Sequence, residues 1–337
     1  MAISLKLRNF KGIKEGELKL DPFTILVGSN NSAKTTVLES LFLLANPFRG
    51  ILGTTVLDII VKSHMLIENQ VGASFLFNGY NSKKASIALD GKELIMYRDR
   101  SNNTFFSLTG TGLPTRITID GNDIEGNWIG QVNIVGNKQF YGGITDQPVE
   151  TLLFNSYVLR YAFNYFRDHW IELANSDIPR RVAEELSDFS YEKYTNFTIE
   201  PFLAGIYTMY ALTASGMRVR ISDLGEGMQI YIAVKLMYDL IKPKTLLWDD
   251  IEAHLNPRML VKIAGWLHDL VNSGVNVIVT THSMEAVKSV AGIVNDAQIA
   301  LLSLEDGKLK SHEMKLSEVE ELQKAGIDVR FAEGYLF

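Results

Sequence analysis

The sequence predicts an α/β protein with a mixed or parallel sheet core, an antiparallel β subdomain and a helical insert. Three observations predict this class. In the last third of the chain, apolar strand-like runs alternate with helical patterns, as in a parallel sheet covered on both faces. Residues 73–143 instead hold short alternating runs separated by Gly, Asn and Asp, which is typical of an antiparallel meander. Residues 145–198 have a helical, aromatic-rich pattern, which we interpret as packing.

The composition is that of a folded protein without thiol chemistry. The chain has 337 residues, of which 46% are hydrophobic and 21% charged, and this excludes a wholly disordered protein. Its net charge of −6 argues that any contact with DNA is local. The absence of cysteine excludes disulfides and thiolate metal sites. We expect a single domain over 1–337, with a first lobe at 1–144, the insert at 145–198 and a last lobe at 199–337.

The first lobe begins with three predicted strands, Ile3–Arg8, Glu17–Leu20 and Phe23–Val27. Apolar spacing then predicts a helix over Lys34–Ala45, which ends before Pro47 because a residue preceding proline avoids helical geometry. A second helix is expected at Thr55–Ile67. The expected meander strands are Ser74–Phe77, Ser86–Leu89, Glu93–Arg98, Thr115–Asp120 and Gln131–Val135, with tight turns at Asp90-Gly91 and Asp120-Gly121.

The last lobe opens with an uncharged stretch, Pro201–Met217. It is short for a membrane span and is interrupted by glycine, so we expect a buried β-hairpin that turns at Ala214–Gly216, in a soluble protein. Strands and helices then alternate. They are helix Gly227–Ile241, strand Thr245–Asp249, helix Pro257–Asn272, strand Val275–Thr280, helix Met284–Ala291 and, after Glu305, a strand and a short helix Leu316–Ala325.

A phosphate-binding loop is predicted after the third strand. The segment from Gly28 to Thr35 fits the pattern GxxxxGK[ST] at every position but Ala33, and it lies between a buried strand and a helix. In such loops backbone N–H groups cradle phosphates, the lysine (here Lys34) adds a positive charge and the Thr35 hydroxyl binds Mg²⁺. Alanine suits position 33 if its φ is negative and is strained if φ is positive. The predicted nucleotide-binding residues here are Gly28, Asn30, Asn31, Ser32, Ala33, Lys34, Thr35 and Thr36.

Two carboxylates follow the apolar strand at Leu246. Alone they would be a solvated strand end, but together with the phosphate loop they predict a catalytic site. We expect Asp249 to hold Mg²⁺ together with Thr35. Asp250, or Glu252 as a second candidate, would orient or deprotonate the attacking water.

A glycine-rich turn, SDLGEGMQ, then feeds a helix and offers further N–H donors to an anion. The segments GSNNSAKTT, SDLGEGMQ, LLWDDIEAHLNP and VIVTTHS, in this order, resemble the ABC-type ATPases of the RecF, SMC and OLD-like group, often described as AAA-type ATPases. The resemblance covers residues 1–48 and 215–305. It implies a P-loop NTPase with an ABC-ATPase-like head.

The resemblance also implies roles for individual residues. In this family two heads sandwich two ATP molecules, and the signature turn of one head contacts the nucleotide of the other. That role falls here on Ser222, Gly225, Glu226 and Gly227, with either Ser222 or Gly225 at the position of the usual signature serine. His282 matches the histidine that senses the γ-phosphate, so Asp250, Glu252 and His282 form the expected catalytic set. Arg8, Asn9 and Lys11 lie where the first strand turn approaches the nucleotide, and Gln131 and Gln139 are both candidates for the glutamine that reaches Mg²⁺.

The function expected from this resemblance is a cytoplasmic, Mg²⁺-dependent ATPase that forms a homodimer on binding ATP and acts in DNA maintenance, repair or antiphage defence. In this family the carboxylate that follows the Mg²⁺-binding aspartate is usually glutamate. Here it is the shorter Asp250, so slow hydrolysis is expected. The alternative is an ATP-gated dimerisation switch that recruits a separate effector. A transporter ATPase is a third option, against which the RNFKG start and the DLGEGMQ turn argue, and no membrane partner is expected. We find neither sustained heptads nor room for a nuclease domain after Glu305, so we expect a bare ATPase head with DNA and an effector protein as candidate partners.

Overall fold

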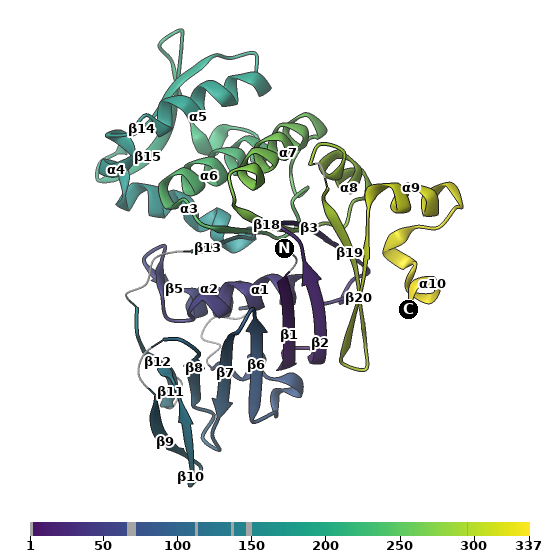
Figure 1. Ribbon diagram of the computed structural model, residues 1–337. Coiled ribbons are helices and arrows are strands. Elements are labelled where there is room, and N and C mark those ends of the chain that lie inside the picture. The colour runs from purple at the N-terminus through teal and green to yellow at the C-terminus, as the bar shows by residue number, and fades with distance from the viewer. Residues whose placement is uncertain (1–2, 66–71, 112–113, 136–137, 146–149, 295) are drawn as a thin grey trace.

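The computed structural model describes residues 3–65, 72–111, 114–135, 138–145, 150–294 and 296–337 (Figure 1). Its centre is a 13-stranded mixed sheet with the order β12-β11-β8-β7-β6-β1-β2-β20-β19-β3-β18-β17-β13. Strand β3 (Phe23–Val27) lies between β18 (Asn276–Thr280) and β19 (Gln298–Glu305), parallel to both. The predicted mixed α/β class is therefore confirmed, and the two ends of the chain share one sheet.

The sheet has an antiparallel half and a parallel half. The antiparallel strands are β1 (Ile3–Phe10), β2 (Ile13–Leu20), β6 (Lys84–Leu89), β7 (Lys92–Arg98), β8 (Thr104–Leu108), β11 (Trp128–Val135) and β12 (Lys138–Gly143). The parallel half adds β13 (Thr151–Phe154) and β17 (Thr245–Trp248) to β18 and β3, and β20 (Lys308–Met314) pairs antiparallel with β19. Every residue of β3 and β13 is buried, which explains why both strands are apolar except for Thr24 and Thr151.

Helix α1 (Lys34–Ala45) lies at the centre of the molecule (Figure 1). It packs on β13 and β18 of the parallel half and on β6 and β7 of the antiparallel half, so the sheet curls around it. The other helices are α2 (Val56–Ser63), α3 (Ser156–Asp168), α4 (Trp170–Ala174), α5 (Ile178–Leu186), α6 (Glu226–Ile241), α7 (Pro257–Asn272), α8 (Met284–Ala291), α9 (Leu316–Lys324) and α10 (Glu333–Leu336). Within the described ranges, no helix has both the length and the apolar character needed to cross a membrane.

A small three-stranded sheet projects from the helical side of the molecule (Figure 1). It consists of β14 (Tyr194–Leu203), β15 (Ile206–Thr213) and β16 (Arg218–Arg220), and α5 packs on β14. The predicted turn at Ala214–Gly216 connects β15 to β16, but a second turn at 204–205 had no polar signal in the sequence. The expectation of a buried hairpin is wrong at this tip, where Leu203 and Ile206 are more than half exposed.

Other predicted elements differ in detail. The run Ser74–Phe77 is not a strand but a 3₁₀ turn over Ser74–Leu76, and the strand β19 was not predicted. The second helix ends at Ser63, and Ile67 lies outside the described residues. Strands β9 (Thr115–Ile119) and β10 (Asn122–Gly126) form a separate two-stranded sheet, as do β4 (Gly50–Ile51) and β5 (Thr54–Thr55). The helices α1, α7 and α8 have the predicted bounds.

Candidate functional site

The parallel strands bring the predicted motifs to one edge of the sheet. The phosphate loop follows β3, Asp249 follows β17 and His282 follows β18, and these three strands are neighbours. Because the carboxyl ends of parallel strands lie at the same edge, residues far apart in the sequence meet there. This edge is the usual ligand-binding position in open α/β sheets.

The loop after β3 requires glycine at its first position. Gly28 has φ +147°, and a Cβ there would lie 2.4 Å from the carbonyl oxygen of Leu302. Beyond it the loop opens into a pocket of about 630 Å³. The residues lining the pocket are Gly12, Asn30, Asn31, Ser32, Ala33, Lys34, Thr35, Thr36, His282 and Leu304.

Ala33 adopts the left-handed conformation, with φ +73° and ψ +15°. This is the conformation that the sequence analysis identified as strained for alanine, because Cβ approaches the following carbonyl. Asn31 is also left-handed, at φ +64°, but asparagine tolerates this region better. The loop therefore keeps the backbone path of a glycine at a position occupied by alanine.

Lys34 is buried within the turn of the loop. Its ammonium donates to the carbonyl oxygens of Gly28 at 3.0 Å and Ser29 at 2.8 Å, and to Ser32 Oγ at 3.3 Å. Two carbonyls and a hydroxyl thus hold the positive charge at the N-terminus of α1. This is the end of the helix that favours an anion.

Asp249 lies directly beside Thr35. The Thr35 hydroxyl donates to Asp249 Oδ1 and Oδ2 at 3.1 Å each, and Thr280 Oγ1 donates to Oδ1 at 2.7 Å. The pKa of Asp249 is raised to about 6, chiefly by burial and to a smaller extent by the neighbouring Asp250 carboxylate, although the hydrogen bonds from Thr280 and Thr35 oppose the shift. The carboxylate is therefore poorly compensated by its protein neighbours, and a cation would stabilise its ionised form.

The oxygens of Thr35 and Asp249 fit Mg²⁺. This ion prefers oxygen ligands and is commonly held by one or two protein groups together with substrate phosphates. No group of three or more His, Cys, Asp or Glu side chains that could hold a metal occurs among the described residues. The fit is therefore to a nucleotide-bound Mg²⁺ rather than to a metal cage of protein ligands.

Asp250 and His282 face one another across the same edge. His282 Nε2 lies 3.6 Å from Asp250 Oδ1, and both side chains are about half exposed. Asp250 has a left-handed backbone at φ +51°, and its N–H donates to Thr280 Oγ1 at 2.8 Å. Burial raises the pKa of Asp250, while His282 lowers it and Glu252 raises it again.

Glu252 has a different place from Asp250. Its Oε1 accepts a hydrogen bond of 2.8 Å from the backbone N–H of His282. Its Oε2 is buried and has no hydrogen-bond partner among the described residues. The position of this carboxylate favours holding the backbone of His282 over acting on a water molecule.

The residues of the signature turn, 222–227, are not among those that line the pocket at the phosphate loop. Gly225 precedes α6, and Ser222, Gly225 and Glu226 are exposed. Glu226 Oε2 pairs with His254 Nδ1 at 3.0 Å, and a Cβ on Gly227 would lie 2.7 Å from the carbonyl oxygen of His254. The turn is therefore packed against the loop that follows Asp250.

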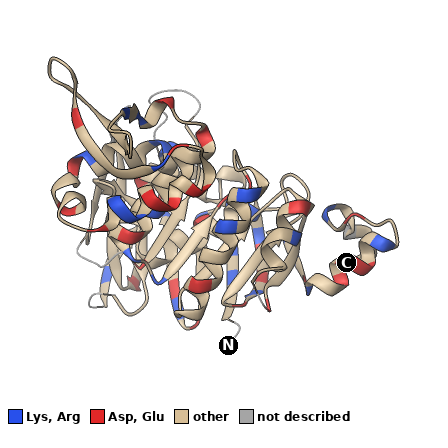
Figure 2. Ribbon diagram, turned by 90° about the horizontal axis from the view of Figure 1, so that it is seen from above, with Lys and Arg blue, Asp and Glu red and all other residues tan. Residues whose placement is uncertain are grey.

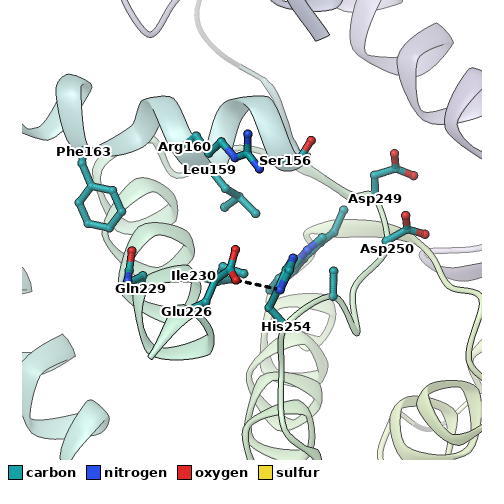
Figure 3. Close-up of a pocket in the computed structure, with 12 residues that line it drawn as sticks. Ser156, Leu159, Arg160, Phe163, Glu226, Gln229, Ile230, Asp249, Asp250 and His254 are labelled. Carbon is teal, nitrogen blue, oxygen red and sulfur yellow. Dashed lines mark ion pairs between the residues drawn. The ribbon is translucent and has the colours of Figure 1, made fainter. Parts of the chain in front are cut away.

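A pocket of about 450 Å³ connects this turn to the two aspartates (Figure 3). Asp249 and Asp250 lie at one end and Phe163 and Gln229 at the other, with the Glu226–His254 pair between them. Ser156 and Arg160 enter from α3. Neither residue could be predicted from the sequence, because a Ser and an Arg four residues apart on an aromatic-rich helix form no recognisable motif.

The remaining predicted residues are dispersed. Asn9 and Lys11 have positive φ at the turn between β1 and β2. The Lys11 ammonium pairs with Glu39 and lies 2.9 Å from His64 Nε2, beside a pocket of about 730 Å³ that shares Gly12 and Thr36 with the loop pocket. Arg8 is exposed on β1 and lines neither pocket.

One of the two glutamine candidates lies away from the site along the sheet. Gln131 lies in β11, which is separated from β3 by seven strands in the sheet order. The side chain of Gln139 lies outside the described residues. The strand that ends beside β17 at the site is instead β13, and Asn155 directly after it caps α3 by accepting from the N–H of Val158 at 2.8 Å.

Two models of known protein families match the chain. Residues 1–111 match a family model described as "AAA ATPase domain", and residues 122–288 match one described as "AAA domain, putative AbiEii toxin, Type IV TA system". No curated protein matches the chain.

Solved structures match over nearly the whole chain. One is an SMC head bound to the C-terminal winged-helix domain of ScpA, with 14% identity, a TM-score of 0.55, and coverage of 95% of this chain and 99% of that chain. Another is the SMC head with an extended coiled coil bound to the C-terminal domain of ScpA from Pyrococcus furiosus, with 14% identity, a TM-score of 0.56, and coverage of 96% and 98%. At this identity the likeness is one of fold. Residues 1–111 and 122–288 thus match AAA-type ATPase family domains, and the chain has the fold of an SMC head.

Proposed function

We propose that this protein hydrolyses ATP with Mg²⁺ at the edge formed by β3, β17 and β18, as a homodimer that closes around the nucleotide. The observation that carries the proposal is the contact of Thr35 with Asp249 beside the buried ammonium of Lys34. Oxygen ligands for Mg²⁺ and a positive charge for the phosphates thereby share one helix N-terminus. The AAA-type family matches support ATP as the nucleotide.

Each residue of the edge has a role in this proposal. Lys34 exchanges its carbonyl partners for phosphate oxygens, and Thr35 and Asp249 hold Mg²⁺, which neutralises phosphate charge when bound. Asp250 orients the attacking water and accepts its proton, and His282 contacts the outermost phosphate. Both side chains are about half exposed, so water and phosphate can reach them from solvent.

Phosphate release tests the hydrolytic part. Wild-type protein with Mg-ATP should release phosphate steadily, and Lys34→Ala and Asp250→Asn should each reduce the rate by at least about a hundredfold. The exposed Lys324→Ala on α9 serves as the control and should match wild type. Wild-type protein that never turns over, even with DNA added, would contradict the proposal.

The proposal of a dimer rests on the signature turn, whose residues 222–227 do not line the phosphate-loop pocket of their own chain. Ser222, Gly225 and Glu226 are exposed at the start of α6, so the N–H groups of this turn are accessible to a second copy. We therefore propose that the turn completes the site of the partner copy. Light scattering should show monomers converting to dimers with Mg-ATP, and Lys34→Ala should block the conversion.

A mixing experiment separates a site shared between copies from a site within one chain. Lys34→Ala and Gly225→Arg should each be inactive alone. If the turn acts on the other copy, a mixture of the two variants contains heterodimers with one intact site and regains part of the activity. A mixture that stays inactive while heterodimers form would assign the turn to its own chain.

Asp250 supports a second candidate function, an ATP-gated switch with slow hydrolysis. Its side chain is one methylene shorter than glutamate, and its left-handed backbone limits how it can be replaced. Asp250→Glu decides between the two: a large gain in rate indicates a site restrained by aspartate, and a loss indicates a site built for it.

We further propose DNA maintenance or antiphage defence as the setting, with a separate effector protein as partner. The SMC heads in the matched structures are bound to ScpA, so a protein partner is a reasonable expectation for this fold. Figure 2 shows basic and acidic residues interspersed over the described part of the chain, without a continuous basic stripe in that view. A pull-down with the Asp250→Asn variant held in Mg-ATP tests for the effector, and filter binding at two salt concentrations tests for DNA.

A further inference from the structure

The backbone of His282 is held from both sides. Its N–H donates to Glu252 Oε1 at 2.8 Å, and its carbonyl oxygen accepts from Arg330 Nη1 at 2.7 Å. The two partners come from opposite directions along the chain, 30 residues before and 48 residues after the histidine. Among the described residues, the one polar contact of the ring is the 3.6 Å approach of Nε2 to Asp250 Oδ1, so the direction of the ring depends on how its backbone is fixed.

Arg330 is itself fixed before it reaches His282. Its Nε donates to Asp328 Oδ1 at 2.9 Å and its Nη2 to Oδ2, and its backbone N–H donates to Oδ1 at 3.0 Å. The hydrogen bonds from the Arg330 side chain lower the pKa of Asp328, so its carboxylate stays ionised. Two of the three guanidinium nitrogens are thus held by Asp328, and the third is directed at the histidine carbonyl.

The segment that carries Arg330 is anchored in the core. It is a 3₁₀ turn over Val329–Phe331, which follows α9, and Val329 and Ala332 are completely buried. Phe331 and Tyr335 point outward and are largely exposed. The position of Arg330 is therefore set by packing rather than by an exposed chain end.

We propose that Arg330 is a positioning residue for the ATPase centre, which sets the direction of the His282 ring by holding the carbonyl of that residue. This inference rests on the proposed role of His282. Together with Glu252 it fixes the peptide planes on either side of the histidine. Loss of Arg330 would release the carbonyl and let the ring leave the space between Asp250 and the phosphate loop. The phosphate loop itself would be unchanged, so kcat should fall more than the affinity for ATP.

Kinetics of matched variants test the proposal. Arg330→Ala should lower kcat about tenfold with KM changed less than twofold, and Asp328→Asn should have a smaller effect of the same kind. Arg180→Ala is the control, because Arg180 forms a similar fork with Asp177 on the surface of α5 away from the site. Arg330→Lys retains one donor and should recover part of the loss.

A double-mutant cycle distinguishes positioning from general support of the fold. If Arg330 acts through His282, adding Arg330→Ala to His282→Ala should lower kcat no further. An equal loss in both backgrounds would overturn the inference, even with the ATPase proposal intact.

A spectroscopic measurement does not depend on turnover. The ring resonances of His282 in NMR spectra should shift in Arg330→Ala and remain unchanged in Arg180→Ala. An unchanged ring would overturn the inference whether or not the protein hydrolyses ATP. If the His282 resonances shift in Arg330→Ala but the protein has no ATPase activity, the result would support the Arg330–His282 contact and would count only against the proposed function.

Discussion

Ala33 places a left-handed alanine in the middle of the phosphate loop. At φ +73° an L-residue with a Cβ is less stable than glycine by about 1–2 kcal/mol. Part of this advantage of glycine is offset, by about 0.4–1 kcal/mol, because glycine also gives the unfolded chain more conformational entropy. We expect Ala33→Gly to raise the free energy of unfolding by about 0.5–1 kcal/mol, measured by urea denaturation without nucleotide.

An alanine in helical geometry provides the control. Ala174 is exposed at the end of α4, and Ala174→Gly should lower the free energy of unfolding by about 0.5–1 kcal/mol. Opposite signs for the two substitutions would show that the backbone of Ala33 is the cause. Equal losses would indicate that the loop is not left-handed in solution.

Asp249 makes stability depend on pH. Its folded pKa of about 6 lies above the ordinary value of 3.8, so the folded state binds this proton more tightly than the unfolded chain. The group therefore favours folding at pH 5, and this contribution is lost as the pH rises through about 6. Asp249→Asn lacks this titrating group. The free energy of unfolding of the variant minus that of wild type should therefore be about 1 kcal/mol higher at pH 7.5 than at pH 5.

Thermal unfolding at the two pH values, without nucleotide or Mg²⁺, measures this difference. Asp306→Asn, in an exposed turn, is the control and should show none. Binding of Mg²⁺ should move in the other direction, because Mg²⁺ must displace the proton from Asp249, so the Mg²⁺ concentration needed for half-maximal ATP hydrolysis should rise below about pH 6. A variant whose relative stability is the same at both pH values would refute the assignment of the pKa to Asp249.

The residues of the site could be predicted where a contiguous motif carried them. Lys34, Thr35 and Asp249 meet because each follows a buried strand, which the sequence displays. The sign of φ at Ala33 could not be predicted, because either conformation was compatible with the sequence. The contact of Arg330 with His282 could not be predicted either, since it joins segments that share no local pattern.

At the scale of the element, the start of α6 offers two glycines with different constraints. A Cβ on Gly227 would lie 2.7 Å from a backbone oxygen, whereas a Cβ on Gly225 would meet nothing within 4 Å. Gly227→Ala should therefore lower the free energy of unfolding by about 1–3 kcal/mol, because the loop at His254 must move. Gly225→Ala should leave it within about 0.5 kcal/mol of wild type.

Circular-dichroism melts of the two variants, made under the same conditions, measure this contrast. Equal stabilities would mean that the loop at His254 yields easily and that α6 is not packed on it as described. The Gly225 variant also isolates the effect of this turn on dimer formation, because its fold is unaltered.

Helices and turns were predicted best where the hydrophobic pattern agreed with the capping and turn residues. Pro257 and the N-cap Asn256 mark the start of α7, and Ser283 caps α8 by accepting from the N–H of Ala286. The turns at Asp90-Gly91 and Asp120-Gly121 have positive φ at both residues, as tight hairpins require. The turn at 204–205 was missed because its flanks are apolar, and Ser74–Phe77 was misassigned because four residues suit a strand and a 3₁₀ turn equally.

At the scale of the whole molecule, the family match to residues 1–111 does not delimit a unit that folds alone. Strand β3 has both of its neighbours, β18 and β19, near the other end of the chain. We expect a fragment of residues 1–144 to be unfolded or aggregated, since its buried strand would lack hydrogen-bonding partners on both edges. Circular dichroism of the fragment, alone and coexpressed with residues 145–337, measures this, and a cooperative melt of the fragment alone would contradict it.

The position of β3 also has a consequence for synthesis on the ribosome. The strand leaves the ribosome early, but about 250 further residues must be translated before β18 appears, which takes roughly 12–50 s at usual rates. During that interval a strand whose residues are all buried in the folded protein has no place in a sheet, and it depends on the antiparallel half or on chaperones for protection. Slow translation of the middle of the gene would therefore lower the yield of folded protein more than slow translation of its last part.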